Sequence, residues 1–394
     1  MGSYLRDVLV EVMPNAVGRW LGKTLPYAPD FVFLTHPRNL EDIYATFPFI
    51  RLLSRLFPKQ TIEKILQWAP CYVVSHVRGP FGKKGYVMGV PVLPEKLFAQ
   101  RKETERLIGR IMSFLNKMTD RKTYVGLAAW WPIVSNSGIS FYEAGKKYDN
   151  LRVTNGHTAT LLSLYLTTLK LAEDLNIPIR KLRLLIIGVG RVGGVLADLF
   201  ASKVKQLGLL DKNPTRLETV RRGLKAVPLN NQCELISMSG DSQQEKLCEK
   251  LKHYDIALCT TSNMNLLVDD ASSLEDCIIV DDSRPEAFPR VCSSEKKVLV
   301  LEGGLMHIPG VSLDSDFGFG TTNDIFGCLA EAIILSIDEE KTLRPNVGEI
   351  DYENFYKMKD FCSSVNIKAG QLKCGQKIVS DKEIELFVME EKSR

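Results

Sequence analysis

The sequence lacks the patterns that identify several common classes of protein. No run of 18 uncharged apolar residues occurs, so no membrane-spanning helix is expected. Nine cysteines are scattered without a CxxC pair, which fits thiols in a reducing compartment and predicts neither a disulfide framework nor a metal site. The P-loop, HExxH and GxSxG signatures are missing, so the usual residues for ATP hydrolysis, zinc proteolysis and serine-hydrolase chemistry are missing too.

The first residues, MGSYLRDVLVEVMP, do not have the order of a targeting signal. A secretory signal begins with a basic region and continues with an apolar one, and a myristoylation signal needs Ser or Thr where this chain has Arg6. We therefore expect a cytoplasmic protein.

Charge is unevenly distributed along the chain. Residues 1–150 contain 21 Lys and Arg against 12 Asp and Glu, a net charge of +9, whereas the remainder contains 30 against 35, a net charge of −5. A basic N-terminal part fits an acidic partner, because complementary fields speed association. The alternative is an ordinary solvated basic surface. Nucleic acid is not expected as a partner, because no binding motif accompanies these residues.

The segment from Arg183 to Asp211 has the order of a dinucleotide site. An apolar run leads into GVGRVGG, a helical pattern follows, and a second apolar run ends at Asp211. Gly188 supplies the tight turn, Gly190 the close approach to a pyrophosphate, and Gly193 the close packing of helix on strand. Asp211 lies at the usual spacing for a ribose contact. The pattern predicts a bound nucleotide near the middle of the chain.

Alternating apolar runs and helical patterns predict an α/β protein with a central, mostly parallel Rossmann-type sheet. We expect an α/β substrate domain over 1–150, a dinucleotide-binding domain over 151–312 and a helical segment over 313–394. Strands are expected near 183–188, 206–211, 233–238, 254–260, 277–282 and 297–301, and helices near 94–118, 157–174 and 322–337.

The first 70 residues contain two short amphipathic pieces. FIRLLSRLF precedes Pro58 and TIEKILQWA precedes Pro70, and both have helical spacing. Packing on a core or lining a tunnel is the favoured interpretation, and contact with a membrane surface is the alternative. The β-like runs CYVVSHV and YVMGVPV that follow predict a pair of strands.

Cys328 is a candidate nucleophile. We expect it in the first turns of a helix capped by Asn323 or Asp324, where the helix dipole favours the thiolate. It shares a helical face with apolar residues, so a core cysteine is the competing interpretation. His157 and His307 are candidate acid or base groups, and each could equally be a hydrogen-bonded structural histidine.

Several blocks together resemble the long-chain acyl-(acyl-carrier-protein) reductases, which form fatty aldehydes. The resemblance covers about residues 72 to 340 and is most specific in the last block. The blocks are LPEKLFAQRK at 93–102, VGLAAWWPIV at 125–134, TNGHTA at 154–159, the glycine turn at 188–194, VLEGG at 300–304 and IFGCLAEAIIL at 325–335.

The resemblance implies a two-step reduction. The acyl group of a thioester, delivered by acyl carrier protein or acyl-CoA, passes to Cys328, and hydride from NADPH then releases it as an aldehyde. An acidic carrier protein would also fit the basic N-terminal part. The implied site has Cys328 and His157 as catalytic residues. The residues expected near the cofactor are Asn155, Thr158, Gly188, Gly190, Arg191, Val192, Gly193, Asp211, Lys212, Arg216, Gly303 and Gly304.

Two departures from the family leave questions open. The glycine turn reads GVGRVGG where the family usually has GATGxxG. Asp211 favours a free ribose and therefore NADH, whereas Lys212 and Arg216 could receive the 2′-phosphate of NADPH, which we place first.

Two rival functions remain. One is a direct dehydrogenase of the shikimate or amino-acid type, without a covalent intermediate, and the other is a non-catalytic nicotinamide-binding protein. Tyr142 and Lys146 form the YxxxK pair of short-chain dehydrogenases, but here the pair precedes the glycine turn rather than following it. The sequence does not determine the oligomeric state.

Overall fold

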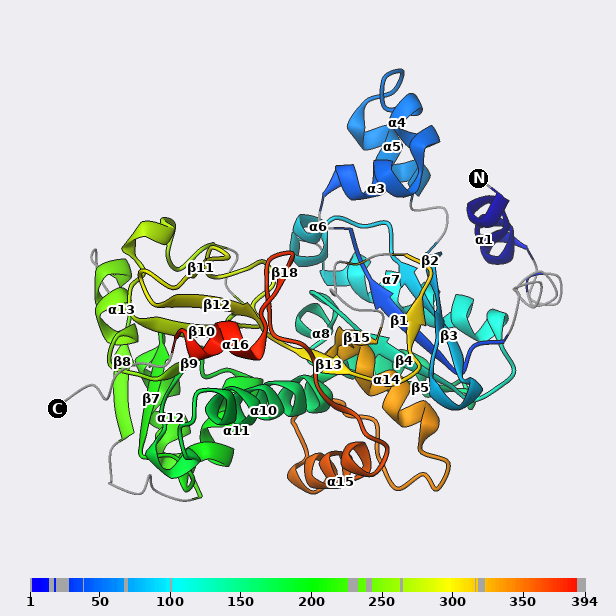
Figure 1. The fold of residues 1–394 in the computed structure, drawn as a ribbon. Helices are drawn as coiled ribbons and strands as arrows, with labels where there is room; N and C mark the ends of the chain where they lie inside the picture. Colours follow the sequence, from blue (N-terminus) through cyan, green and yellow to red (C-terminus); the bar gives the residue numbers. More distant parts are fainter. Residues whose placement is uncertain are drawn as a thin grey trace. The chain divides into compact units, whose positions relative to one another are not determined.

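The computed structural model divides the chain into two compact units (Figure 1). Unit 1 comprises Met1–Ala159, Ile308–Phe317 and Cys328–Val365, and unit 2 comprises Thr160–His307, Gly318–Gly327 and Asn366–Arg394. The structure describes residues 2–13, 18, 28–37, 39–66, 70–99, 101–225, 233–238, 243–262, 265–315, 317 and 323–387.

Unit 1 is built on a six-stranded sheet with the order β14-β2-β3-β1-β4-β5. Strands β3, β1, β4 and β5 are parallel, and β2 pairs antiparallel with β3 and with β14. The pairing of β2 with β3 confirms the two strands predicted from CYVVSHV and YVMGVPV. The strands are β1 (Phe31–Thr35), β2 (Tyr72–Arg78), β3 (Lys84–Gly89), β4 (Thr123–Leu127), β5 (Leu151–Thr154) and β14 (Ser312–Leu313).

The helices of unit 1 bury apolar side chains against this sheet and against one another. Trp131, Tyr86, Phe114 and Phe141 are among its fully buried side chains. The helix predicted over 94–118 is two helices, α6 and α7. The helices are α1 (Gly2–Val12), α3 (Leu40–Thr46), α4 (Pro48–Leu53), α5 (Lys59–Leu66), α6 (Pro94–Ala99), α7 (Arg101–Met118), α8 (Trp131–Val134), α9 (Ile139–Gly145) and α15 (Tyr352–Ser364), with a 3₁₀ turn at Pro80–Gly82.

Unit 2 is built on a seven-stranded sheet with the order β11-β12-β10-β9-β6-β7-β8. Its six parallel strands, numbered along the chain, follow the order 3-2-1-4-5-6 of dinucleotide-binding folds, and β11 pairs antiparallel at one edge. All six predicted strands are confirmed. They are β6 (Arg183–Ile187), β7 (Gln206–Asp211), β8 (Cys233–Ser237), β9 (Ile256–Cys259), β10 (Cys277–Asp281) and β12 (Val298–Glu302), with β11 at Cys292–Ser293.

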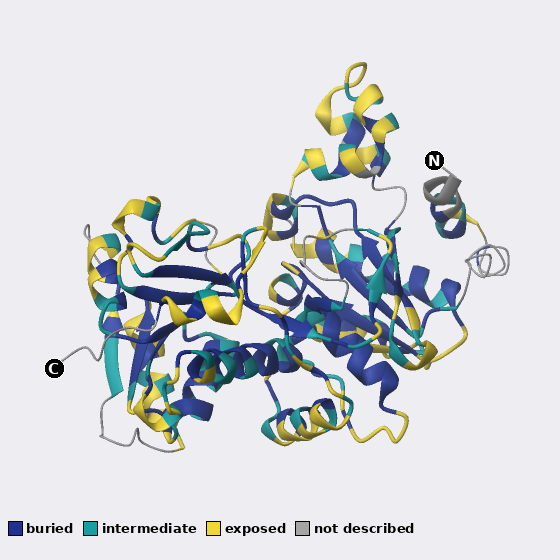
Figure 2. Ribbon diagram, in the orientation of Figure 1, coloured by how far each residue is buried: buried dark blue, intermediate teal, exposed yellow. Residues whose placement is uncertain are grey.

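Burial explains why the central strands of this sheet are largely apolar. Every residue of β9 and β10 is buried, as expected for strands that are covered on both faces (Figure 2). The helices that connect the parallel strands are α11 (Arg191–Ala201), α12 (Pro214–Gly223) and α13 (Gln243–Leu251), and 3₁₀ turns lie at Ile179–Lys181 and Ala271–Ser273.

Two helices have residues in both units. The first, α10 (His157–Asp174), confirms the apolar helix predicted from the TNGHTAT segment. The second, α14 (Gly327–Ile337), corrects the prediction of a helix from residue 322 with Asn323 or Asp324 as its cap. Asp324 instead begins a short strand, and the helix starts three residues later.

A small antiparallel sheet and a hairpin complete unit 2. Strand β13 lies between β15 and β16, and β17 pairs with β18. Much of the predicted helical segment 313–394 is therefore not helical. These elements are β13 (Leu305–His307), β15 (Asp324–Phe326), β16 (Lys368–Ala369), β17 (Lys373–Cys374), β18 (Lys377–Ile378) and α16 (Asp381–Glu385). No helix in the described part of the chain is long and apolar enough to cross a bilayer.

Candidate functional site

The glycine turn between β6 and α11 has three glycines in three different situations. Gly188 has a φ of +85°, which glycine adopts without strain. A Cβ on Gly193 would lie 2.1 Å from the Gly188 carbonyl oxygen and 2.6 Å from Thr260 Oγ1. A Cβ on Gly190 would meet no atom within 4 Å. The turn is thus tightly packed at Gly193, where the helix meets the strand, and has open space at Gly190, where a pyrophosphate is expected to approach.

The start of α11 is arranged as an anion site. Gly190 is the N-cap residue and offers no side chain to the first backbone N–H groups of the helix. The N–H groups of a first helical turn point toward the N-terminus, and together with the helix dipole they favour a negative charge at this position. Arg191 is exposed and Val192 half-buried, so both predicted site residues lie at this helix start.

Asp211 is tied to the glycine turn. Its carboxylate accepts hydrogen bonds from the backbone N–H of Val189 at 3.0 Å and of Asn213 at 2.9 Å. Arg216 Nη1 lies 3.7 Å from Asp211 Oδ2, and its side chain is 51% exposed. Lys212 is exposed beside them. The structure therefore places the groups that favour either cofactor close together after β7. Asp211 is suited to a ribose hydroxyl, and Lys212 and Arg216 are suited to a phosphate.

The neighbouring strands contribute further groups to the same edge of the sheet. Thr260 Oγ1, directly after β9, donates to the Gly188 carbonyl at 2.7 Å. The side chain of Asp282 fills the space that glycine leaves at position 304, because a Cβ there would lie 2.2 Å from Asp282 Oδ1. Gly303 and Gly304 thus allow the ends of β10 and β12 to pack closely. Burial raises the pKa of the Asp282 carboxyl to about 7, and nearby Arg284 opposes this shift.

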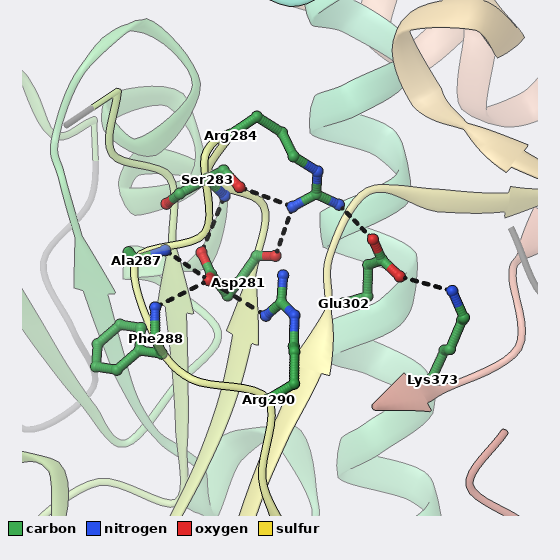
Figure 3. Close-up of polar contacts among 8 residues, drawn as sticks. All are labelled: Asp281, Ser283, Arg284, Ala287, Phe288, Arg290, Glu302 and Lys373. Carbon is green, nitrogen blue, oxygen red and sulfur yellow. Dashed lines mark hydrogen bonds and ion pairs between the residues drawn. The ribbon is translucent and has the colours of Figure 1, made fainter. Parts of the chain in front are cut away.

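A buried charged cluster fixes the loop after β10 (Figure 3). Asp281 is fully buried and accepts hydrogen bonds from the backbone N–H of Ser283 and Ala287 and from Arg290 Nη1. Arg284 donates to Glu302 at 2.9 Å, and the other oxygen of Glu302 accepts from Lys373 at 3.0 Å.

These bonds hold the loop after β10 close to the end of β12. Buried charges are costly unless they are paired, and here each carboxylate of the cluster has a cationic partner.

His307 and Asp324 form an imidazole–carboxylate pair in unit 2. They face each other across the pairing of β13 with β15, and His307 Nδ1 lies 2.9 Å from Asp324 Oδ1. Asp324 is 1% exposed and also accepts from the Gln371 N–H, whereas the His307 side chain is 27% exposed. A buried carboxylate that orients a partly exposed imidazole is the arrangement used in acid–base catalysis.

Cys328 is the second residue of α14 and lies against the TNGHTA turn of unit 1. A Cβ on Gly156, whose φ is +76°, would lie 2.7 Å from both Cα and Cβ of Cys328. A Cβ on Gly126 in β4 would lie 3.6 Å from the Cys328 carbonyl oxygen. Cys328 and His157 are both half-buried. The structure thus brings together three of the sequence blocks on which the resemblance rests.

Glu331 fastens this turn to α14. Glu331 is fully buried. One of its carboxylate oxygens accepts a hydrogen bond from Thr154 Oγ1, and the other accepts one from the Ala159 N–H at 2.9 Å. Burial raises the pKa of the Glu331 carboxyl, while the hydrogen bonds from Thr154 and from the backbone oppose this. A single side chain three residues beyond Cys328 therefore holds both ends of the segment 154–159.

Asn155 and Thr158 are buried inside the same turn. Asn155 Nδ2 donates to the Ser137 carbonyl at 3.0 Å, and its Oδ1 accepts from the His157 N–H and from Asn346 Nδ2. Thr158 Oγ1 is buried and has no hydrogen-bond partner among the described residues. Asn155 has a structural role here, and the cofactor contact expected for both residues stays a prediction.

The sequence reasoning did not identify Glu331, Asp282 or the partner of His307. A signal for Glu331 exists, because it is the one charged residue of the apolar helix GCLAEAIILSI, and a charge in such a helix must be paired. For Asp282 and Asp324 the sequence offers no signal, since their partners come from other strands.

No protein-family model matches the sequence, and no curated protein matches it. Among solved structures, glutamate dehydrogenase from Thermus thermophilus is 12% identical and covers 92% of this chain and 80% of its own, with a TM-score of 0.44. L-tryptophan dehydrogenase from Nostoc punctiforme is 14% identical, covers 86% of this chain and 80% of its own, and has a TM-score of 0.35.

A third structure is matched over a shorter length. Dipicolinate synthase from Bacillus subtilis is 16% identical with a TM-score of 0.30, and the match covers 50% of this chain and 60% of the synthase chain. The protein thus spans less than two thirds of the length of this relative. Because all three scores lie below 0.5, these likenesses establish neither a shared fold nor a shared activity, and the fold rests on the strand order described above.

Proposed function

We propose that this protein is an NAD(P)H-dependent oxidoreductase that reduces a long-chain acyl thioester to an aldehyde through an acyl group on Cys328. The nucleotide half of the proposal rests on one observation: the glycine turn lies at the point of the 3-2-1-4-5-6 sheet where the strand order reverses, which is where dinucleotides bind in such sheets.

The residues of unit 2 fit a dinucleotide. The open space at Gly190 leaves room for a pyrophosphate on the N–H groups of α11, and Asp211 or Arg216 would meet the adenosine ribose. When bound, the reduced nicotinamide would supply a hydride. We place NADPH ahead of NADH, because Lys212 and Arg216 both lie exposed at the end of β7.

The residues of unit 1 fit the covalent step. Cys328 lies at the start of a helix, where the dipole favours a thiolate, and it is half-buried rather than sealed. Attack of its sulfur on the acyl carbon breaks the donor's C–S bond, and the donor thiolate leaves and takes up a proton. Hydride addition at the same carbon then breaks the Cys328 C–S bond, which gives the aldehyde and returns the cysteine thiolate.

The donor would be acyl carrier protein or acyl-CoA. The net charge of +9 in residues 1–150 supports an acidic donor, since both candidates carry negative charge. His157 belongs to the turn that packs on Cys328 and is the residue we assign to proton handling beside the sulfur.

Aldehyde formation tests the proposal. The purified chain, given acyl-CoA or acyl carrier protein with NADPH, should produce aldehyde. Cys328→Ser should lose at least about a thousandfold in rate, because a serine hydroxyl is a much weaker nucleophile than a cysteine thiolate. Cys233→Ser is the matched control, since Cys233 is also half-buried but lies in β8. Full activity of Cys328→Ser would exclude a covalent intermediate.

A direct dehydrogenase is the second candidate, and one observation favours it. The contact of Cys328 with Gly156 gives this cysteine a place in the packing of the turn that requires no chemistry. In that case the oriented His307 would be the group that exchanges a proton with a bound carbonyl or imine substrate. This candidate predicts reduction of a small ketone or imine at the same rate in Cys328→Ser.

A further inference from the structure

The turn between α4 and α5 exposes an unusual group of apolar side chains. Leu52 is 60% exposed, Leu56 72% and Phe57 45%, and all three lie within six residues. Figure 2 shows α4, α5 and the turn between them with mostly exposed residues on the outer side. We call residues 51–59 the α4–α5 tip. Single exposed leucines are ordinary on protein surfaces, but a group of three large ones marks a contact surface.

The backbone places two of these side chains together. The Leu56 and Phe57 N–H groups both donate to the Leu53 carbonyl, and the Ser54 N–H donates to the Ile50 carbonyl, so helical turns continue beyond the end of α4. Leu52 and Leu56, four residues apart, therefore share one face.

The opposite face of the same helices is already occupied. Ile50, Ile62 and Leu66 are buried with Ile43, Phe47 and Tyr72 in a separate small core. The exposed apolar residues therefore form a second face of these helices, distinct from the face that packs in this core. The prediction that these amphipathic pieces pack on a core is confirmed for their buried face. Their other face carries the exposed apolar side chains of the tip.

The tip is also basic. Arg55 and Lys59 are exposed, and Arg51 is 54% exposed while pairing with Glu41 at 2.7 Å. No Asp or Glu occurs from residue 43 to residue 62. Large apolar side chains surrounded by Lys and Arg, without acidic residues between them, are the composition of segments that insert into the interface of anionic membranes.

We propose that the α4–α5 tip docks this protein on an anionic lipid bilayer, with Leu52, Leu56 and Phe57 entering the interface and Arg55 and Lys59 contacting the headgroups. A stable interface with another protein needs about 800 Å² on each partner, which three side chains on one turn do not provide. A bilayer needs only the burial of these side chains and attraction of the basic groups. The proposal does not depend on the reaction, because docking is measured without substrate.

Co-sedimentation of the full chain with vesicles tests it. Vesicles of phosphatidylcholine alone are compared with vesicles that also contain phosphatidylglycerol, at low and at high salt. The wild type should sediment with the anionic vesicles and be released by salt. Leu56→Asp should weaken binding at least about tenfold, the effect expected from losing one buried leucine, and Arg55→Gln about fivefold.

The matched control is Leu386→Asp. Leu386 is 61% exposed, close to the value for Leu56, but follows the acidic helix α16, which contains Asp381, Glu383 and Glu385. Leu386→Asp should bind vesicles like the wild type, and the thermal unfolding of both variants should be unchanged, since both side chains are exposed.

Three results would overturn the proposal: no sedimentation with either vesicle, wild-type binding by Leu56→Asp, or an equal loss in Leu386→Asp. Loss of acyl-carrier-protein binding in Leu56→Asp, with no vesicle binding by the wild type, would assign the tip to a protein partner instead. Aldehyde formation from acyl-CoA in solution should be the same in Leu56→Asp and in wild type, so failure of docking and failure of the proposed reaction are distinguished.

Discussion

The two units use the same local device, a glycine turn between a parallel strand and a helix, with opposite results. In unit 2, a Cβ on Gly190 would enter open space at the start of α11. In unit 1, a Cβ on Gly156 would collide with Cys328 at 2.7 Å, close to the start of α10. One glycine leaves space for a ligand, and the other allows a second helix to come close.

This difference indicates how each unit contributes to the proposed chemistry. The turn in unit 2 leaves open space at Gly190, beside the start of α11, so its proposed role is to bind a phosphate. The turn in unit 1 is held by the buried Glu331 and supports a cysteine, so its value lies in the position of that side chain. A glycine motif therefore predicts a ligand only where the structure leaves the space beside it open.

Replacing Gly193 and Gly190 separately by alanine should distinguish a glycine needed for packing from a glycine needed for ligand binding. Gly193→Ala places a Cβ 2.1 Å from the Gly188 carbonyl oxygen, so we expect it to lower the free energy of unfolding by about 3 kcal/mol. Gly190→Ala, with nothing within 4 Å, should unfold within about 0.5 kcal/mol of wild type but bind nucleotide at least about tenfold more weakly. Thermal unfolding and nucleotide titration measure the two effects. Equal stability of both variants would contradict the packing described here.

Glu331→Gln tests the fastening of the unit 1 turn. The amide has only one acceptor oxygen, so either Thr154 Oγ1 or the Ala159 N–H loses the carboxylate oxygen to which it donates in this buried site. We expect the free energy of unfolding to fall by about 2 kcal/mol. Glu339→Gln is the control, because the Glu339 side chain is 80% exposed and should change stability by less than about 0.5 kcal/mol. Similar values for both variants would mean that Glu331 does not hold the turn.

Asp282 should make the stability of unit 2 depend on pH. Its folded pKa of about 7 lies above the usual value, so the folded state binds more protons and stability falls as the pH rises from about 4 to about 7. Asp282→Asn should remove this contribution. Since the side chain is partly exposed, we expect the variant to be more stable than wild type by about 1 to 2 kcal/mol at pH 8 and by much less at pH 4.

Unfolding curves at a series of pH values check this prediction, with the exposed Asp360→Asn as control. A difference between Asp282→Asn and wild type that does not grow with pH would show that the Asp282 carboxyl titrates normally.

Arg216→Gln should show which of the two cofactors the protein prefers, through a change in KM that is smaller than the effects above. If Arg216 contacts a 2′-phosphate, its loss should raise KM for NADPH about fivefold and leave KM for NADH unchanged, as expected for an exposed charge pair. The two KM values measured on one preparation provide their own control. Equal changes for both cofactors would remove Arg216 from the phosphate site.

The sequence predicted unit 2 far better than the neighbourhood of Cys328. Apolar runs separated by helical patterns predict the ends of the six parallel strands within one or two residues, because strands inside a sheet covered on both faces are largely apolar. The start of α14 was predicted wrongly, since Asp324 pairs across strands with His307, seventeen positions away.

The partners of Glu331 could not be predicted at all. Thr154 lies 177 residues away in the chain, and no local pattern records a hydrogen bond over that separation. The function of Cys328 likewise rests on a resemblance together with the geometry of its turn, and not on spacing or composition.

In the proposed reaction, Cys328 carries the acyl group. This is tested by incubating the full chain with a long-chain acyl-CoA, without reductant, and then measuring the intact mass and mapping the peptides. We predict one acyl group on the Cys328 peptide, released as aldehyde when NADPH is added, and none on the half-buried Cys233 or Cys292. An unmodified Cys328 in a preparation that still forms aldehyde would contradict the account.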